Sequence, residues 1–468
     1  MSDPRPPSPT SAHPDRHRSA LVEILAAAAV IALCGWLGAR LGWRGRPKTA
    51  TATALWPFYL DTWFTQTVWS VRVLAPLALF AAGWPLLRRF VAGTLGPLPV
   101  VGMAYLFHVG CGIVRNGVSA GLVHTLLRVQ EYWRDVPCVV AGFLRRFPEG
   151  CALSMHGDTH PPGLILVLAL VQRLGFVSPQ AATLVCATAA SLTALPLYGA
   201  ARRLTDEQTG RWAVVLYLFA SSVSTFAVLS MDMVVLLLST VALYGLCRVL
   251  STPERCDWLG GLLWGLGLAA ASMCSFLVGL LTLSYAALIF QAWRGRQVTR
   301  GVWLALGLGP VSFVLAYALL MLGFGYRPFH VLRHCLRALA LSPDNQRSPV
   351  LALLGNPVAF LGALGLPLCG LYAHSLGTGL RRALAKRDLQ MVGLIAASAL
   401  PLLLAILLGK PRGEAERIYL PFVPLLVIAA AAAARRFYAR SEGWLLGLAL
   451  PLAALQSILV EVFFETLW

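Results

Sequence analysis

The sequence predicts an all-α, polytopic integral membrane protein with about 13 transmembrane helices and with juxtamembrane helices in one large outer loop. Of its 468 residues, 58% are hydrophobic and only 12% are charged, whereas soluble domains carry about 25% charged residues. The formal net charge of +18 does not indicate a nucleic-acid partner. Most arginines fall in short clusters between apolar runs, where they set the orientation of a membrane protein.

The two ends of the chain are predicted to lie outside the main domain. Residues 1–20 are rich in Pro and Ser and basic, which predicts a disordered cytoplasmic tail. Residues 21–96 are predicted to hold two N-terminal transmembrane helices, at 21–42 and 64–86, because the first run is too long for the core of a signal peptide. Residues 435–468 hold the last span, at 443–462. The other predicted spans are 97–114, 180–201, 212–230, 233–250, 258–275, 277–293, 302–323, 351–376, 388–409 and 417–434.

Loop charge predicts how these helices are oriented. With the N-terminus in the cytoplasm, all six inner loops are basic, as the positive-inside rule requires. They are 86–90, 201–211, 247–256, 293–300, 380–388 and 434–440. The scheme works only if the apolar run 161–176, roughly 24 Å long as a helix, does not cross the bilayer. Alternatively, that run spans and another does not. We therefore expect a multi-pass protein of the inner (plasma) membrane.

Outer loop 115–160 concentrates carboxylates in a chain that has only 20 acidic residues. Glu131 and Asp135 are four residues apart, so a helix places both on one face. Solvated pairing with Arg128 and Arg134 is the alternative explanation. The sequence contains ten cysteines without a CxxC pair. Cys138 and Cys151 flank part of this loop and could form a disulfide if the loop is extracytoplasmic.

The loop ends in the stretch MHGDTHPPG, which contains His156, Asp158 and His160. Pro161 and Pro162 exclude an ordinary helix interior there. We interpret the stretch as part of a site, after which the two prolines turn the chain back into the membrane. A simple helix entry with incidental polar residues is the alternative.

Asp232 is the only charged residue between Trp212 and Arg248. The predicted topology places it at the outer mouth of a tight helical hairpin, where a carboxylate needs a partner or a function. An N-cap for the following helix is the structural alternative.

Two predicted outer loops are basic, against the positive-inside trend, which indicates an anionic partner. In loop 324–350, residues Arg327, His330, His334 and Arg337 recur every three or four positions, and Arg333 lies among them. The partner could be anionic lipid head groups or the phosphate of a bound lipid substrate, which arginine binds with two hydrogen bonds. In loop 409–424, Arg417 is predicted at a helix entrance near head-group depth.

The order of these features resembles the polytopic C-type glycosyltransferases (GT-C), nearest the bacterial protein-mannosyltransferase and aminoarabinose-transferase group. The likeness covers roughly 97–434, which we interpret as the catalytic membrane domain. It rests on the Glu131-Tyr-x-x-Asp135 setting, the Thr-His-Pro-Pro-Gly element, Asp232, and the segment ERIYLPFVP with Arg417 and Tyr419. Those families usually show adjacent acidic residues after their first helix, whereas Glu131 and Asp135 are spaced.

The resemblance implies transfer of a sugar from a polyprenyl-phosphate donor to an extracytoplasmic acceptor: an envelope glycan, a lipid or a protein. A carboxylate would accept the acceptor's proton while cations hold the leaving phosphate. The expected catalytic residues are Asp135, Glu131, Asp158 and Asp232. The expected substrate-binding residues are His156, His160, Arg327, Arg333, Arg337, Arg417 and Tyr419. No cofactor is certain, and a divalent metal held by Asp158 and His160 remains open.

Two other classes of protein compete with this interpretation. A transporter or flippase of a lipid-linked substrate would show internal repeats with broken helices near mid-membrane, and neither is clear in the sequence. A non-catalytic subunit of an envelope complex would not need a carboxylate-rich loop facing arginine-rich loops.

Overall fold

The computed structural model describes residues 71–463 apart from short gaps at 125–126, 151, 179, 296–297, 343–348, 410–411, 413, 438–442 and 444. At 71, 115–124, 127–130 and 350–351 it describes the backbone alone. Before residue 71 it describes Ala29, Leu33 and the backbone of two short strands, so the predicted span 21–42 lies almost entirely outside the described residues.

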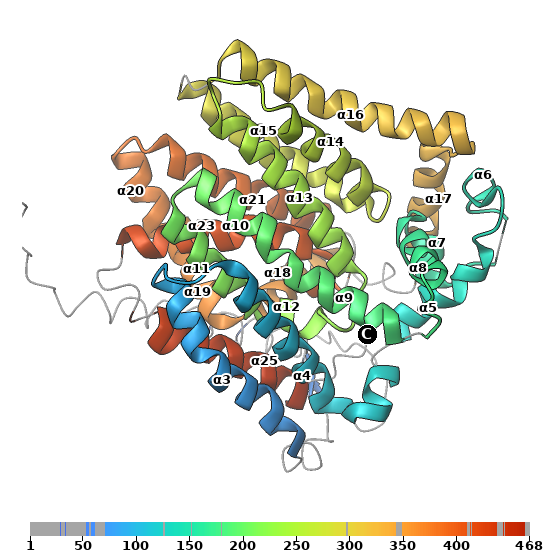
Figure 1. The fold of residues 1–468 in the computed structure, drawn as a ribbon, viewed down its shortest axis with the longest axis horizontal. Helices are drawn as coiled ribbons and strands as arrows, with labels where there is room; N and C mark the ends of the chain where they lie inside the picture. The colour runs from blue at the N-terminus through green and yellow to red at the C-terminus, as the bar shows by residue number, and fades with distance from the viewer. Residues whose placement is uncertain are drawn as a thin grey trace, which may run out of the picture.

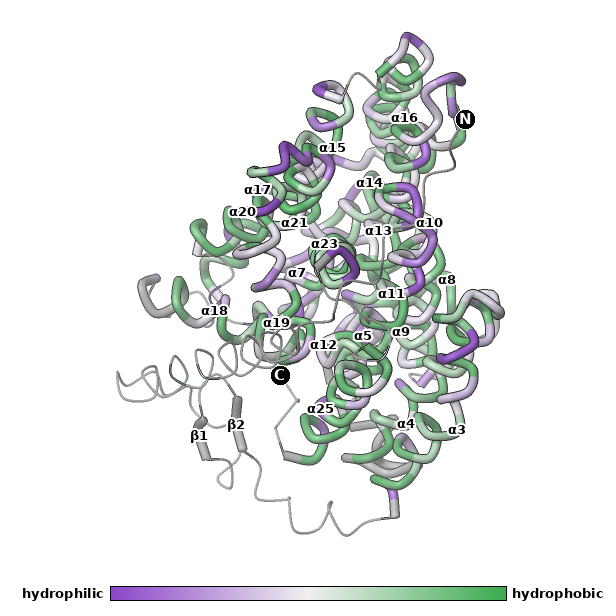
Figure 2. The backbone as a smooth tube through the Cα atoms, turned by 90° about the vertical axis from the view of Figure 1, so that its left-hand side faces the viewer, coloured by the Kyte–Doolittle hydropathy of each residue, from purple (hydrophilic) through white to green (hydrophobic). Residues whose placement is uncertain are grey.

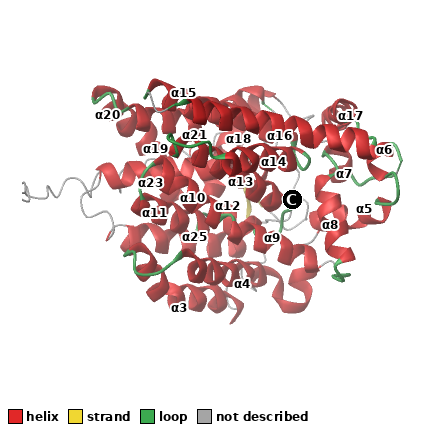
Figure 3. Ribbon diagram, turned by 45° about the horizontal axis from the view of Figure 1, so that its top comes forward, coloured by secondary structure: helices red, strands yellow, loops and turns green. Residues whose placement is uncertain are grey.

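The described chain is almost entirely helical, which confirms the predicted fold class (Figures 1 and 3). Strands β1 (Thr53–Leu55) and β2 (Phe58–Leu60) form one antiparallel pair. The helices of the first half are α3 (Leu74–Val91), α4 (Pro97–His124), α5 (Leu127–Asp135), α6 (Phe143–Arg146), α7 (Met155–Thr159), α8 (Gly163–Arg173), α9 (Gln180–Leu192), α10 (Ala194–Leu204), α11 (Glu207–Leu218), α12 (Ser221–Phe226) and α13 (Asp232–Ser251).

The second half continues the same pattern. Its helices are α14 (Trp258–Ser272), α15 (Leu281–Arg294), α16 (Arg300–Phe324), α17 (Pro328–Leu341), α18 (Pro349–Leu364), α19 (Leu366–His374), α20 (Leu380–Ala385), α21 (Leu389–Leu408), α22 (Ala415–Ile418), α23 (Val423–Phe437) and α25 (Leu450–Phe463). Short 3-10 or π turns are η1 (Val71–Val73), η2 (Val136–Cys138), η3 (Phe276–Leu280), η5 (Ser375–Gly379), η6 (Leu420–Phe422) and η7 (Leu445–Ala449).

Nine helices of the described part are long and apolar enough to cross a membrane, or up to ten if one bent pair is a single span. The predicted count of about 13 is therefore not confirmed. The predicted span 212–230 is divided between two helices, α11 and α12. The predicted span 258–275 becomes α14, which has only 15 residues. Helix α8, with 11 residues, is too short to cross, as expected of the run 161–176.

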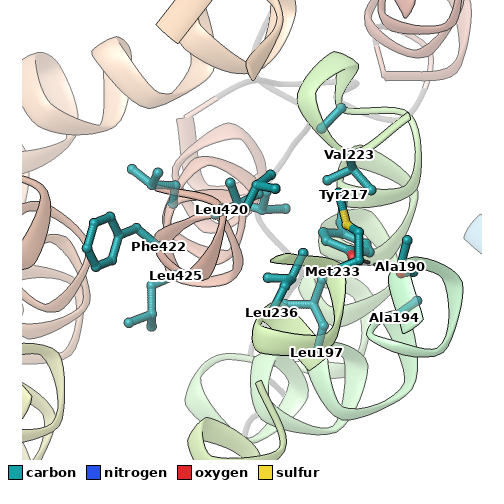
Figure 4. Packing of buried hydrophobic residues seen from close by; sticks show 14 of the residues in the cluster. Ala190, Ala194, Leu197, Tyr217, Val223, Met233, Leu236, Leu420, Phe422 and Leu425 are labelled. Carbon is teal, nitrogen blue, oxygen red and sulfur yellow. Dashed lines mark hydrogen bonds between the residues drawn. The ribbon is translucent and has the colours of Figure 1, made fainter. Parts of the chain in front are cut away.

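The centre of the bundle is formed by the span that contains α22 and α23. Within this span, Ala415–Arg436, 94% of the most apolar window is buried, against 22% for Arg300–Phe324 in α16. Figure 4 shows Met233 and Leu236 of α13 between the residues of α9 to α11 and Leu420, Phe422 and Leu425. Small residues on α9 and α23 let the helices approach closely, which is how helices pack in lipid. Helix α16 therefore presents most of its surface to lipid.

Helices α18 and α19 form a broken pair, bent by 112°, where a single span was expected over 351–376. Gly365 lies between them with φ of 109°, a conformation that favours glycine. The side chain of Gln456 in α25 accepts from the Leu366 amide at 2.8 Å and donates to the Gly362 carbonyl at 3.1 Å. These bonds satisfy backbone groups that a membrane interior would otherwise leave without partners.

The predicted inner loops lie at one end of the bundle. A hydrogen bond and two ion pairs join four of them, a hydrogen bond joins the other two, and a cation–π contact to the nearby end of α13 links the two groups. The predicted alternation of the spans, with these loops on one side, is therefore consistent with the fold. Figure 2 shows hydrophilic stretches at the helix ends and apolar stretches along the helices. The contacts are Arg211 with the Phe90 carbonyl, Arg435 with Asp206, Arg436 with Asp388, Thr299 with the Pro253 carbonyl, and Arg203 over the ring of Tyr244.

Candidate active site

Short helices α5 to α8 gather with α17 at one side of the molecule (Figures 1 and 3). Glu131 and Asp135 lie one turn apart on α5, as predicted. Both carboxylates bind the segment around α7. The alternative of pairing with arginines is not supported for Arg134, which is exposed and has no ion pair among the described residues. The side chain of Arg128 lies outside the described residues.

Asp135 holds the N-terminus of α7. Its Oδ1 accepts from the Ser154 amide at 2.9 Å, and its Oδ2 accepts from Ser154 Oγ at 2.7 Å. Ser154 Oγ in turn caps α7 by accepting from the Gly157 amide at 3.2 Å. A Cβ added to Gly157 would lie 2.1 Å from Asp135 Oδ2, so this approach requires glycine. Burial raises the pKa of Asp135, while the hydrogen bonds from Ser154 oppose that rise.

Glu131 forms the second contact with α7. Its Oε2 lies 2.5 Å from Nδ1 of His156. The His156 ring stacks on His160, with centroids 6.3 Å apart and planes 15° apart. The ring of Tyr132 meets both imidazoles edge-on, at centroid distances of 6.1 and 6.2 Å. The predicted residues His156 and His160 therefore form one aromatic cluster with Tyr132.

The His-Pro-Pro-Gly element docks on the turn between α14 and η3. The Gly163 amide donates to the Met273 carbonyl at 2.7 Å. A Cβ at Gly163 would lie 2.4 Å from that oxygen, so the backbones approach too closely for a larger residue. Pro161 and Pro162 are buried, and α8 begins directly after them. The stretch is a helix entry, but one whose polar residues each have specific partners.

Asp232 and Arg417 form a buried ion pair across the bundle, with Nη1 and Oδ2 3.0 Å apart. Arg417 Nη2 also lies 2.7 Å from Oε2 of Glu414, and Ser230 Oγ donates to Asp232 at 2.8 Å. The N-cap alternative for Asp232 is wrong, because Met231 is the N-cap of α13 and Asp232 is the first helical residue. Arg417 is buried in the protein and does not face lipid head groups. Its Nε has no hydrogen-bond partner within the described structure.

The ion pair and the histidine cluster lie within electrostatic reach of each other. Burial lowers the pKa of His160 to about 4; the Asp232 carboxylate opposes this decrease and the Arg417 guanidinium adds to it. Burial also raises the pKa of Tyr132, and Asp232 raises it further. Residues from α5, the α7–α8 turn, α13 and α22 thus meet in one polar region.

The predicted basic residues of α17 lie in two different surroundings. His334 Nε2 lies 2.6 Å from Oδ1 of Asp158, and His330 Nε2 lies 3.0 Å from Oε1 of Glu149. The arginines of the cluster, which are Arg327, Arg333 and Arg337, are exposed. The expected single face is therefore split: its histidines bind the outer loop and its arginines do not.

Two further expectations concern Tyr419 and a metal. Tyr419 is fully buried, donates its hydroxyl to the Ala405 carbonyl at 3.2 Å, and packs on Phe360 and Phe422. Asp158 pairs with His334. Among the described residues no group of three or more His, Cys, Asp or Glu side chains could hold a metal ion.

Sequence reasoning missed several residues of this region. Tyr132 lies inside the Glu131–Asp135 motif, and Glu414 lies in the loop that contains Arg417, but neither was predicted to be a site residue. Ser154 carried a detectable signal, because a serine before a short polar stretch is typical of an N-cap. The contact between Gly163 and Met273 had no sequence signal, since it joins residues far apart in the chain.

Comparison with known proteins finds one family model and several solved structures that resemble this chain. Residues 159–320 match the family model of dolichyl-phosphate-mannose-protein mannosyltransferases, starting directly before His160. The chain is similar to ArnT from Cupriavidus metallidurans bound to undecaprenyl phosphate, with a TM-score of 0.51 and 17% identity over 78% of this chain and 62% of that chain. The fold is that of a C-type glycosyltransferase.

The likeness to solved structures covers only part of those larger proteins. AglB, an archaeal oligosaccharyltransferase from Archaeoglobus fulgidus in complex with an inhibitory peptide and a dolichol-phosphate, is similar with a TM-score of 0.46 and 11% identity. That likeness covers 79% of this chain and 56% of AglB. The chain thus spans less than two thirds of the length of these relatives. No curated protein matches the sequence.

Proposed function

We propose that this protein is a membrane glycosyltransferase that moves a sugar from a polyprenyl-phosphate donor to a hydroxyl of an extracytoplasmic acceptor. The observation that carries the proposal is the meeting of the outer-loop residues Glu131, His156 and His160 with the buried Asp232–Arg417 pair. The GT-C fold and the match that begins at Thr159 support it.

The reaction requires one proton acceptor and a site for the leaving phosphate. The acceptor oxygen forms a bond to the anomeric carbon of the sugar. The bond from that carbon to the phosphate oxygen breaks, and polyprenyl phosphate leaves with the electron pair. A base takes the proton of the attacking hydroxyl, which is worth about 10²–10⁴-fold in rate.

The Glu131–His156 pair is our candidate for the base. Asp135 is only 3% exposed, and both of its oxygens accept hydrogen bonds from Ser154. The Glu131 side chain is 30% exposed, so an acceptor can approach it. A carboxylate hydrogen-bonded to Nδ1 also orients an imidazole and supports proton uptake by the pair. We therefore assign Asp135 the positioning of α7.

Arg417 is our candidate for binding the donor phosphate. Its Nε is a buried donor without a partner in the described structure, and such a group favours a polar ligand. Asp232 and Glu414 offset its charge, so a phosphate would have to replace one of them. Glu414 is the more replaceable partner, because its φ of 58° is unfavourable for a residue other than glycine. Arg327, exposed at the start of α17, is a second candidate.

Two observations favour an extracytoplasmic site. The six basic loops gather at one end of the bundle, and positively charged loops are retained in the cytoplasm. Cys138, which belongs to the outer loop, is disulfide-bonded, and disulfides persist in oxidising compartments. Pairing with Cys151 stays a prediction, because Cys151 lies outside the described residues.

The function is tested by incubating the purified, reconstituted protein with a panel of radiolabelled polyprenyl-phosphate sugars and an envelope extract. We expect transfer of label, or slow hydrolysis of the donor, for at least one sugar. If no donor is consumed across the panel, the proposal is wrong.

A further inference from the structure

Helix α17 presents two faces of different chemistry. One face contacts the protein: Val331 and Cys335 are buried, while His330 and His334 beside them pair with Glu149 and Asp158 of the outer loop. This face fixes α17 against α7.

The opposite face of α17 is exposed and combines apolar side chains with arginines. Phe329 is 75% exposed and Leu336 is 54% exposed. Arg333, Arg337 and Ala340 are exposed at helical spacing on the same side. Neither arginine has a hydrogen bond or ion pair in the described part of the chain. We call these five residues the outer face of α17.

The outer face continues a surface that already faces lipid. Helix α16 is only 22% buried over its most apolar window and ends with exposed residues such as Leu322 and Phe324. Gly325, with φ of 68°, ends α16, and α17 begins shortly afterwards at Pro328. The chain therefore leaves the apolar layer of the membrane where the outer face begins. At this depth the charged ends of arginines reach the lipid head groups while their aliphatic stems stay in the apolar layer.

We propose that the outer face of α17 docks on the anionic phospholipid head groups of the bilayer. Exposed Phe329 and Leu336 would enter the boundary of the acyl layer, while Arg333 and Arg337 would bind lipid phosphates. The other face of α17 holds Asp158 and Glu149, so docking would keep the α7 segment at head-group level. The proposal does not depend on the transferase activity.

The test uses the full chain with Cys34→Ser and Cys256→Ser and a bimane fluorophore on Ala340→Cys, in vesicles of equal parts phosphatidylcholine and phosphatidylglycerol. A nitroxide quencher is carried either by phosphatidylglycerol or by an equal amount of phosphatidylcholine. We expect phosphatidylglycerol-borne quencher to quench about threefold more strongly, because each arginine near the surface attracts anionic lipid. The variant Arg333→Gln/Arg337→Gln should quench equally with both lipids.

The matched control removes the same charge elsewhere. Arg255→Gln/Arg294→Gln changes two exposed arginines near the other end of α16 and should keep the preference. Equal quenching in the unchanged arginine background would overturn the proposal. Weak quenching from both lipids would overturn it as well, because a second copy or another protein would then cover the face. A preference seen only after polyprenyl phosphate is added would assign the arginines to the donor instead.

Discussion

Asp135 and Glu131 lie one helical turn apart, yet their surroundings give them different roles at the residue scale. Asp135 is buried and accepts two hydrogen bonds from Ser154, whereas Glu131 is partly exposed beside His156. The sequence predicted that both carboxylates belong to the site. It could not tell which is accessible, because that depends on how α7 folds back onto α5.

The first prediction separates these roles. Glu131→Gln should lower the transfer rate by about 10²–10⁴-fold at normal protein level, since it removes the proton acceptor. Asp135→Asn should retain measurable turnover and lose about 1–3 kcal/mol of stability. Initial rates and thermal unfolding of both variants measure the two effects.

Ser154→Ala is the matched control for Asp135→Asn. Both changes disrupt the hydrogen bond from Ser154 Oγ to Asp135 Oδ2, so their combined effect on stability should be smaller than the sum. If Asp135→Asn abolishes turnover while Glu131→Gln remains active, the base is Asp135.

The second prediction concerns Arg417. Arg417→Ala should weaken the binding of polyprenyl phosphate about 10- to 100-fold, or about 1.5–3 kcal/mol, because a charge-assisted hydrogen bond is lost. Arg417→Lys should weaken it less, since the charge beside Asp232 remains. Glu414→Gln should strengthen binding, because a competing carboxylate is removed. Titration calorimetry measures all three affinities.

Stability needs to be followed in parallel for the Arg417 variants. Alanine leaves Asp232 buried without its ion-pair partner, which costs about 3–5 kcal/mol. Affinities must therefore be taken from the folded fraction. Equal affinity in wild type, Arg417→Lys and Arg417→Ala would show that Arg417 only stabilises the bundle.

At the element scale, the sequence predicts the membrane-spanning helices well but does not predict where a helix is broken. Long apolar runs such as α16 and α21 lie where they were expected. The bend between α18 and α19 was missed, because its exposed backbone groups are satisfied by Gln456 from a distant helix. The pairing of Asp232 with Arg417 was unpredictable for the same reason: periodicity identifies a helix but not its neighbours.

The third prediction tests the small helix α7. Gly157→Ala places a methyl group only 2.1 Å from Asp135 Oδ2, so the carboxylate must move. We expect a lower unfolding temperature and reduced transfer. Gly307→Ala in α16 is the matched control, because a Cβ there meets nothing within 4 Å. Equal effects of the two changes would show that the contact between Asp135 and α7 is unimportant.

At the scale of the whole molecule, charge separates the two ends of the bundle. The basic loops contact each other at one end, as the distribution of arginine predicted. Which end faces the cytoplasm follows only from the positive-inside rule, since a helix bundle by itself has no preferred sidedness.

The fourth prediction tests this sidedness with one cysteine at each end. Met155→Cys, at the exposed first residue of α7, should react with a membrane-impermeant maleimide added outside intact cells. The native Cys256, exposed in a predicted inner loop, should react only after permeabilisation. Both are read in a Cys34→Ser background. Labelling of Cys256 alone from outside would reverse the proposed orientation.

The proposed role of Glu131 in sugar transfer is tested most directly by the rate of sugar release from a polyprenyl-phosphate donor by the reconstituted protein, compared between wild type, Glu131→Gln and Gly307→Ala. If the region around Glu131 and His156 is a transferase site, wild type and Gly307→Ala should release sugar and polyprenyl phosphate together at similar rates. Glu131→Gln, equally folded, should release at least about 100-fold less. Equal rates in all three proteins, or no release by wild type from any donor of the panel, would contradict a transferase site at Glu131.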